Sequence, residues 1–168
     1  MKRLSLALIG TCLLAMQMGC ASSGGRHQAS GEIYDPAVDG ERLLARAAAT
    51  ARKEHKLVLL DLGANWCSDS QATYRLLRTD PAIRRELKRH YVLTMVDVNQ
   101  KDNANRNEAL VQSLGNPIGR GIPVLLVLTP DGKLLNSDPA ERLKDDAYKD
   151  PTRVLAYLEK WAAALPPR

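Results

Sequence analysis

The sequence predicts a single α/β domain, with a mixed β-sheet in the middle and helices on both of its faces. Short, nearly continuous apolar runs suit buried strands, and they lie at residues 56–62, 91–98 and 122–129. Segments with helical spacing separate these runs, and strands joined by helices pair in parallel. The Pro-Asp-Gly order at residues 130–132 suits a hairpin turn. A short antiparallel fourth strand is therefore expected at residues 134–135.

The helical segments carry start and stop signals. Asp80 and Asp150 each stand directly before a proline, the order of an N-cap and a first helical position. Gly115 follows a helical segment and suits the C′ position that ends it. On the helix that follows Cys67, the apolar side is expected to hold Ala72, Leu76 and Leu77. Helices are expected at residues 40–53, directly after Cys67, from Pro81 to residue 90, at about residues 105–114 and from Pro151 onward.

Composition narrows the class of protein. The chain has 168 residues, of which 45% are hydrophobic and 26% are charged, as in a globular domain. It has no Phe, so the core must be built from Leu, Val, Ile and Ala. The net charge is +5, and the basic residues are interspersed with acidic ones, which is typical of a solvated surface. A nucleic-acid partner is therefore not expected.

The N-terminal residues predict export. A basic start is followed by an apolar run at residues 4–18, which is shorter than the roughly 20 residues of a membrane span. The ending Met-Gly-Cys resembles a bacterial lipoprotein signal, cut before a cysteine that is then lipidated. The predicted organisation is a signal peptide at 1–19, lipidated Cys20 with a flexible tether at 20–35, and a domain at 36–168. An ordinary secretory signal or an uncleaved anchor are the alternatives.

A lipoprotein signal implies a bacterial envelope protein that faces the periplasm. Ala21 stands where an Asp usually retains such proteins at the inner membrane, so the outer membrane is favoured. Cleavage before Cys20 would remove Cys12, and the lipid would block Cys20 itself. Cys67 would then be the one free thiol of the mature chain, and no internal disulfide could form.

Two stretches resemble signatures of the thioredoxin superfamily. "LVLLDLGANWCSDS" at residues 57–70 is an apolar strand with an acid, followed by Trp-Cys at the start of a helix. "GIPVLLVLTPDGK" at residues 121–133 is similar to the second signature, which has a cis proline before a strand. The resemblance covers about residues 36–165 and is closest to the envelope branch that includes the C-terminal domain of thiol:disulfide interchange reductants. It implies a three-layer thioredoxin-like fold.

The chain departs from this family at Ser70. A dithiol enzyme has its second, resolving cysteine three residues after the first, and here that position is a serine. No other cysteine of the expected mature domain can replace it. Turnover between a dithiol and an intramolecular disulfide is therefore excluded for this site.

Three residues are candidates for catalysis. Cys67 is expected at a helix N-terminus, where free backbone N–H groups favour a thiolate nucleophile. The hydroxyl of Ser70 can donate a hydrogen bond to that thiolate. The resemblance implies that Asp61, six residues before Cys67, is a buried acid with a raised pKa that relays a proton. A retained structural acid is the alternative for Asp61.

The candidate substrate-binding residues are Trp66, Ile122 and Pro123. Trp66 would flank the thiol as an apolar wall, although ordinary half-buried packing is an equal alternative. The resemblance implies that Pro123 is cis and presents the backbone of Ile122 to an extended peptide beside the sulfur. No cofactor is expected, and no metal either, since the three histidines are isolated and lack ligand spacing with a cysteine.

These residues leave three functions open. The first is a monothiol oxidoreductase or isomerase, in which Cys67 forms a mixed disulfide that a second thiol resolves. Its partner would be a cysteine-containing envelope protein or a small thiol such as glutathione. The second is a redox-inactive binding or chaperone-like module that uses the cis-proline groove. The third is a structural envelope lipoprotein without thiol chemistry.

Overall fold

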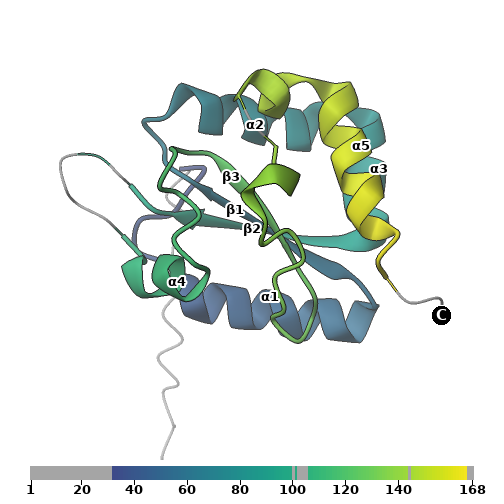
Figure 1. The fold of residues 1–168 in the computed structure, drawn as a ribbon, viewed down its shortest axis with the longest axis horizontal. Coiled ribbons are helices and arrows are strands. Elements are labelled where there is room, and N and C mark those ends of the chain that lie inside the picture. Colours follow the sequence, from purple (N-terminus) through teal and green to yellow (C-terminus); the bar gives the residue numbers. More distant parts are fainter. Residues whose placement is uncertain (1–31, 100, 102–105, 144, 166–168) are drawn as a thin grey trace, which may run out of the picture.

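The structure is a computed structural model, and it describes residues 32–99, 101, 106–143 and 145–165 (Figure 1). The expected signal peptide and the lipidation site Cys20 lie outside these residues. In the part of the chain that the structure describes, no helix is long and apolar enough to cross a membrane.

A three-stranded mixed sheet forms the centre, in the order β2-β1-β3. The central strand β1 (Leu57–Gly63) pairs in parallel with β2 (Tyr91–Asp97) and antiparallel with β3 (Val124–Leu128). Every residue of β1 and β3 is buried, because both faces of the sheet are covered. The three predicted strands and the mixed character of the sheet are confirmed. The expectation that all three pair in parallel is wrong for β3, which follows a helix but runs antiparallel to β1.

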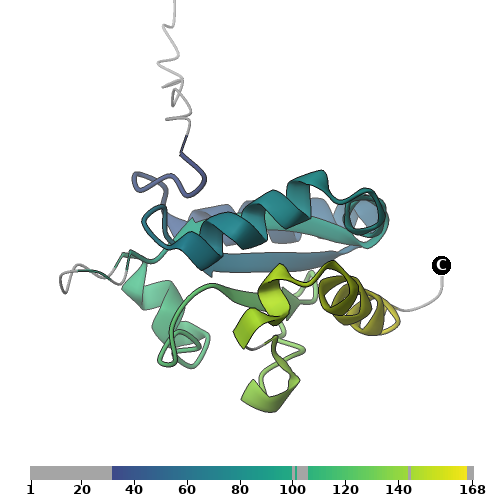
Figure 2. The same ribbon diagram turned by 90° about the horizontal axis from the view of Figure 1, so that it is seen from above.

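Helices cover both faces of the sheet, as predicted. The helices α1 (Gly40–Glu54) and α4 (Glu108–Ser113) pack on one face, and α2 (Ser68–Thr79), α3 (Pro81–His90) and α5 (Pro151–Ala162) pack on the other (Figure 1). Figure 2 shows α4 and the segment between β3 and α5 on the same side of β1, beside β3. The fold is therefore the three-layer α/β fold expected from the sequence.

The predicted helix signals hold in the structure. The carboxylate of Asp80 accepts hydrogen bonds from the backbone N–H groups of Ala82 and Ile83, and Pro81 takes the first turn of α3. Gly115 has a left-handed φ of 78°, and its N–H donates to the carbonyl of Gln112. Two details differ from expectation: α4 begins at Glu108, and the buried positions of α2 include Thr73 rather than Ala72.

The predicted fourth strand is wrong, because the hairpin after β3 closes with a single antiparallel bridge between Leu128 and Leu134. The side chain of Asn136 forms hydrogen bonds with the backbone at the edge of β3 instead. Its Oδ1 accepts from the N–H of Val127 at 2.9 Å, and its Nδ2 donates to the carbonyl of Leu125 at 3.0 Å. Asn136 is fully buried, so these bonds satisfy a sheet edge without a further strand.

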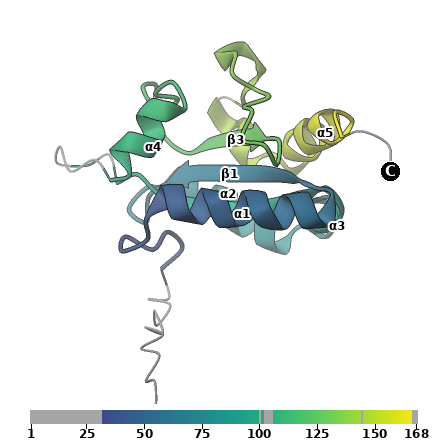
Figure 3. The same ribbon diagram turned by 90° about the horizontal axis from the view of Figure 1, so that it is seen from below.

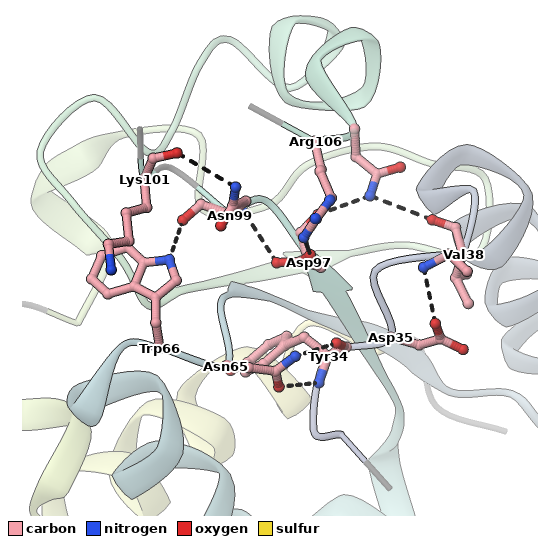
Figure 4. Close-up of polar contacts among 11 residues, drawn as sticks. Tyr34, Asp35, Val38, Asn65, Trp66, Asp97, Asn99, Lys101 and Arg106 are labelled. Atoms are coloured by element: carbon pink, nitrogen blue, oxygen red, sulfur yellow. Dashed lines mark hydrogen bonds and ion pairs between the residues drawn. The ribbon is translucent and has the colours of Figure 1, made fainter. Parts of the chain in front are cut away.

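The folded domain also begins earlier than the predicted boundary at residue 36. Tyr34, placed by the sequence analysis in the tether, is fully buried. Asn65 brackets its backbone: the N–H of Tyr34 donates to Oδ1 of Asn65 at 3.0 Å, and Nδ2 of Asn65 donates back to the carbonyl of Tyr34 at 2.7 Å (Figure 4). Figure 3 shows this N-terminal segment below the carboxyl end of β1. Tyr34 therefore belongs to the folded domain.

Candidate functional site

Cys67 stands at the junction of the β1–α2 turn and the helix. It is the N-cap residue of α2, with extended backbone angles, and its carbonyl accepts the first helical bond from the N–H of Gln71. The residue is 8% exposed, and it is the free cysteine of the described residues. The sulfur therefore lies at the positive end of the α2 macrodipole, as the sequence predicted.

The cis-proline loop contacts this sulfur. The peptide bond between Ile122 and Pro123 is cis, as the resemblance implied. The Cys67 thiol donates a weak hydrogen bond to the carbonyl of Ile122, with an S···O distance of 3.6 Å. Pro123 is buried and Ile122 half-buried. The structure thus brings together three predicted site residues from segments 55 positions apart in the sequence.

Ser70 lies one helical turn after Cys67 and is fully buried. Its Oγ accepts a hydrogen bond from the backbone N–H of Ala64 at 3.4 Å, and its hydroxyl lowers the pKa of Tyr34 in part. The hydroxyl that replaces a second thiol is therefore built into the turn between β1 and α2. This placement fixes the turn that carries Cys67.

Asp61 is the buried acid of the site. It lies in the middle of β1 and is fully buried, and its Oδ2 accepts a hydrogen bond from the Tyr34 hydroxyl at 3.0 Å. Its Oδ1 has no hydrogen-bond partner among the described residues. Burial raises the pKa of Asp61 to about 7, and the bond from Tyr34 lowers it in part. Asp61 therefore changes charge near neutral pH.

Tyr34 is the site residue that sequence reasoning missed. It stands 27 positions before Asp61, in a segment without periodicity, and no local pattern marks it. Burial and the neighbouring Asp61 raise the pKa of Tyr34, so its hydroxyl remains a hydrogen-bond donor at physiological pH. The only sequence signal is a lone aromatic residue at the end of a Ser- and Gly-rich stretch.

Trp66 lies at the rim of the site. It is 48% exposed, and its indole N–H donates to the carbonyl of Asn99, in the loop after β2 (Figure 4). That loop is held in turn by Asp97, whose carboxylate accepts from the N–H of Asn99 and pairs with Arg106. The indole is therefore fixed at one end while much of its surface stays open to solvent, which suits a flanking wall.

A groove of about 390 Å³ runs beside the cis-proline loop. Ile122 and Pro123 form part of one wall, and Arg142 and Tyr148, from the segment between β3 and α5, form the other. Asp69, in the first turn of α2, also lines the groove. Its carboxylate is paired with Lys149 at 2.8 Å, so its charge is partly neutralised close to the site.

The chain belongs to the thioredoxin-like family, whose profile matches residues 40–130, more than half of the sequence. The match includes β1, Cys67, the cis-proline loop and β3. No curated protein is significantly similar to the chain.

Solved structures give the same fold. A disulphide isomerase from Xylella fastidiosa Temecula1 is 28% identical, with a TM-score of 0.65, and the match covers 79% of this chain and 98% of that one. A thioredoxin from Thermus thermophilus is 20% identical with a TM-score of 0.52, over 69% and 81% of the two chains. The oxidised DsbD C-terminal domain of Neisseria meningitidis is 19% identical with a TM-score of 0.53, over 73% and 96%.

Proposed function

We propose that the protein is a single-thiol disulfide-exchange protein that acts through Cys67. The observation that carries this proposal is the contact between the Cys67 sulfur and the carbonyl of Ile122, at the start of α2. In this contact the Cys67 thiol, the N-terminus of α2 and the backbone of the cis-proline loop meet, which supports a nucleophilic role for the thiol. The similarity to a disulphide isomerase, at 28% identity over nearly all of that chain, supports the same chemistry.

The reaction consists of two exchanges. The Cys67 thiolate attacks one sulfur of a substrate disulfide, a new S–S bond forms, and the other substrate sulfur leaves as a thiolate that takes up a proton. Asp61, which titrates near neutral pH, exchanges that proton. A second thiolate then attacks the mixed disulfide and releases Cys67. When that thiolate belongs to the substrate itself, the net reaction is isomerisation without a change in oxidation state.

The second thiol must come from another molecule. Ser70 stands where a resolving cysteine would be, and Cys67 is the free cysteine of the described residues. The proposed partners are therefore cysteine-containing envelope proteins or a small thiol such as glutathione. The proposed location is the periplasmic side of the bacterial envelope, with the outer membrane favoured and Cys20 as the lipid anchor. The motif that ends at Cys20 supports this location.

Trapping tests the proposal in cells. Acid quench of cells that express the full chain is expected to preserve mixed disulfides, seen as thiol-sensitive bands of higher mass in non-reducing gels. They are expected to disappear in Cys67→Ala and to persist in Cys20→Ala, which keeps the site. Bands that survive Cys67→Ala, or none at all from a folded wild-type protein, would contradict disulfide exchange at this cysteine.

A binding module is the second candidate function. Two observations favour it: Cys67 is only 8% exposed, and the groove beside Pro123 is large enough for several side chains of a peptide. Under this alternative the groove holds a partner and the thiol takes no part. An absence of mixed disulfides in the trapping experiment would favour it.

A further inference from the structure

The Tyr34 side chain lies at the meeting point of the site's polar groups. Its hydroxyl donates to Oδ2 of Asp61 at 3.0 Å, and the hydroxyl of Ser70 lowers the pKa of Tyr34 in part. It is also near enough to Cys67 for a charge on that sulfur to raise the pKa of Tyr34, after burial and Asp61. One hydroxyl from the N-terminal segment thus links the buried acid to the residue that replaces the second thiol.

The turn between β1 and α2, which carries Cys67, leaves space for the Tyr34 side chain. A Cβ atom at Gly63 would lie 2.4 Å from the Tyr34 hydroxyl, so only glycine leaves room for it. Two residues later, Asn65 holds the Tyr34 backbone with two hydrogen bonds (Figure 4). The Asn65 carbonyl in turn accepts from the side chain of Gln71, in the first turns of α2. The contacts that fix Tyr34 are therefore the same ones that join β1 to α2.

We propose that Tyr34 is a positioning residue of this site: its hydroxyl holds the Asp61 carboxyl by a hydrogen bond, in the turn that carries Cys67 and Ser70. The segment that follows the expected tether thereby completes the site rather than only leading into it. This inference deepens the proposed function and rests on it for the role of Cys67. The hydrogen bond from the Tyr34 hydroxyl to Asp61 does not depend on that function.

The proposal has a defined electrostatic consequence. Burial raises the pKa of Asp61 to about 7, and the Tyr34 bond acts against burial because it stabilises the carboxylate. Two groups face this carboxyl: Tyr34, which donates to it, and Tyr148, whose own pKa is raised by burial and by Asp61. Loss of the Tyr34 hydroxyl alone should therefore move the Asp61 titration to higher pH, since nothing else compensates for burial.

The test compares full-length wild-type protein with Tyr34→Phe, which keeps the ring and removes the hydroxyl. Titration of the Asp61 side-chain carboxyl by carbon NMR is expected to give a midpoint about one pH unit higher in Tyr34→Phe. Tyr91→Phe is the matched control, because it removes a buried hydroxyl that donates to the carbonyl of Leu158. Its midpoint should equal the wild type. The pH profile of Cys67 alkylation should show an inflection that moves with the Asp61 midpoint.

Each outcome has a distinct meaning. An unchanged Asp61 midpoint in Tyr34→Phe would overturn the inference whatever Cys67 does in cells. A shifted midpoint with an alkylation profile that does not follow it would overturn the link to the thiol. If Tyr34→Phe does not fold, Asn65→Ala, which releases the Tyr34 backbone, should produce the same upward displacement. A shifted midpoint without mixed disulfides in the trapping experiment would contradict the proposed function and leave the positioning role supported.

Discussion

Ser70→Cys is expected to convert the site into one that forms an internal disulfide with Cys67 and reduces insulin catalytically. Ser70 is fully buried one helical turn after Cys67, at the start of α2. A thiol there would resolve the mixed disulfide within the same molecule, and intramolecular attack has a large advantage over attack by a separate thiol. The rate of insulin reduction with dithiothreitol should rise on the order of tenfold or more.

The matched control is Ser113→Cys, which adds a second thiol at the end of α4, on the other face of the sheet. It should leave the insulin reduction rate at the wild-type level, because it cannot close a ring with Cys67. An internal disulfide that fails to form in a folded Ser70→Cys protein would show that the two side chains do not face each other across the first turn of α2.

Asp61→Asn is expected to change how stability depends on pH. The wild-type carboxyl has a folded-state pKa of about 7 against an ordinary value of 3.8. Because the folded state binds the proton more tightly, the stability that this group contributes is complete below about pH 4 and is lost as pH rises through about 7. The asparagine does not titrate. Between pH 5 and pH 8 the unfolding free energy of wild type should fall by about 2–3 kcal/mol relative to Asp61→Asn.

Urea denaturation at the two pH values measures this difference directly. The asparagine also places an amide N–H₂ where one carboxyl oxygen has no partner among the described residues, which costs about 1–3 kcal/mol at both pH values. That cost cancels in the comparison across pH. Asp69→Asn is the control, since this acid is half-exposed and paired with Lys149. Parallel stability curves for wild type and Asp61→Asn would contradict a buried carboxyl that titrates near neutral pH.

Local signals in the sequence were sufficient for most of the fold. Apolar runs predicted β1, β2 and β3, and the proline after Asp80 and after Asp150 predicted where α3 and α5 begin. These features depend on residues that are neighbours in the sequence, so periodicity and capping rules can predict them. The contact between Cys67 and the cis-proline loop came instead from the family resemblance, because nothing local connects two segments so far apart in the chain.

The features that were not predicted are contacts of single polar side chains with residues far away in the sequence. Asn136 replaces the backbone of a strand, and a single polar side chain leaves no periodic pattern. Tyr34 reaches Asp61 from a stretch whose composition is typical of a tether. Lys149 pairs with Asp69 although the two residues lie far apart in the sequence. Each contact becomes visible only when the sheet has brought the segments together.

Reaction of the full-length protein with glutathione disulfide tests the central claim, that Cys67 alone forms a mixed disulfide which another thiol must resolve. Intact mass spectrometry under non-reducing conditions is expected to show a glutathione adduct that fragmentation places on Cys67. The adduct should persist in wild type, disappear on addition of free glutathione, and be absent from Cys67→Ala. Folded protein whose Cys67 stays unmodified, while the same protein reacts fully in denaturant, would contradict the claim.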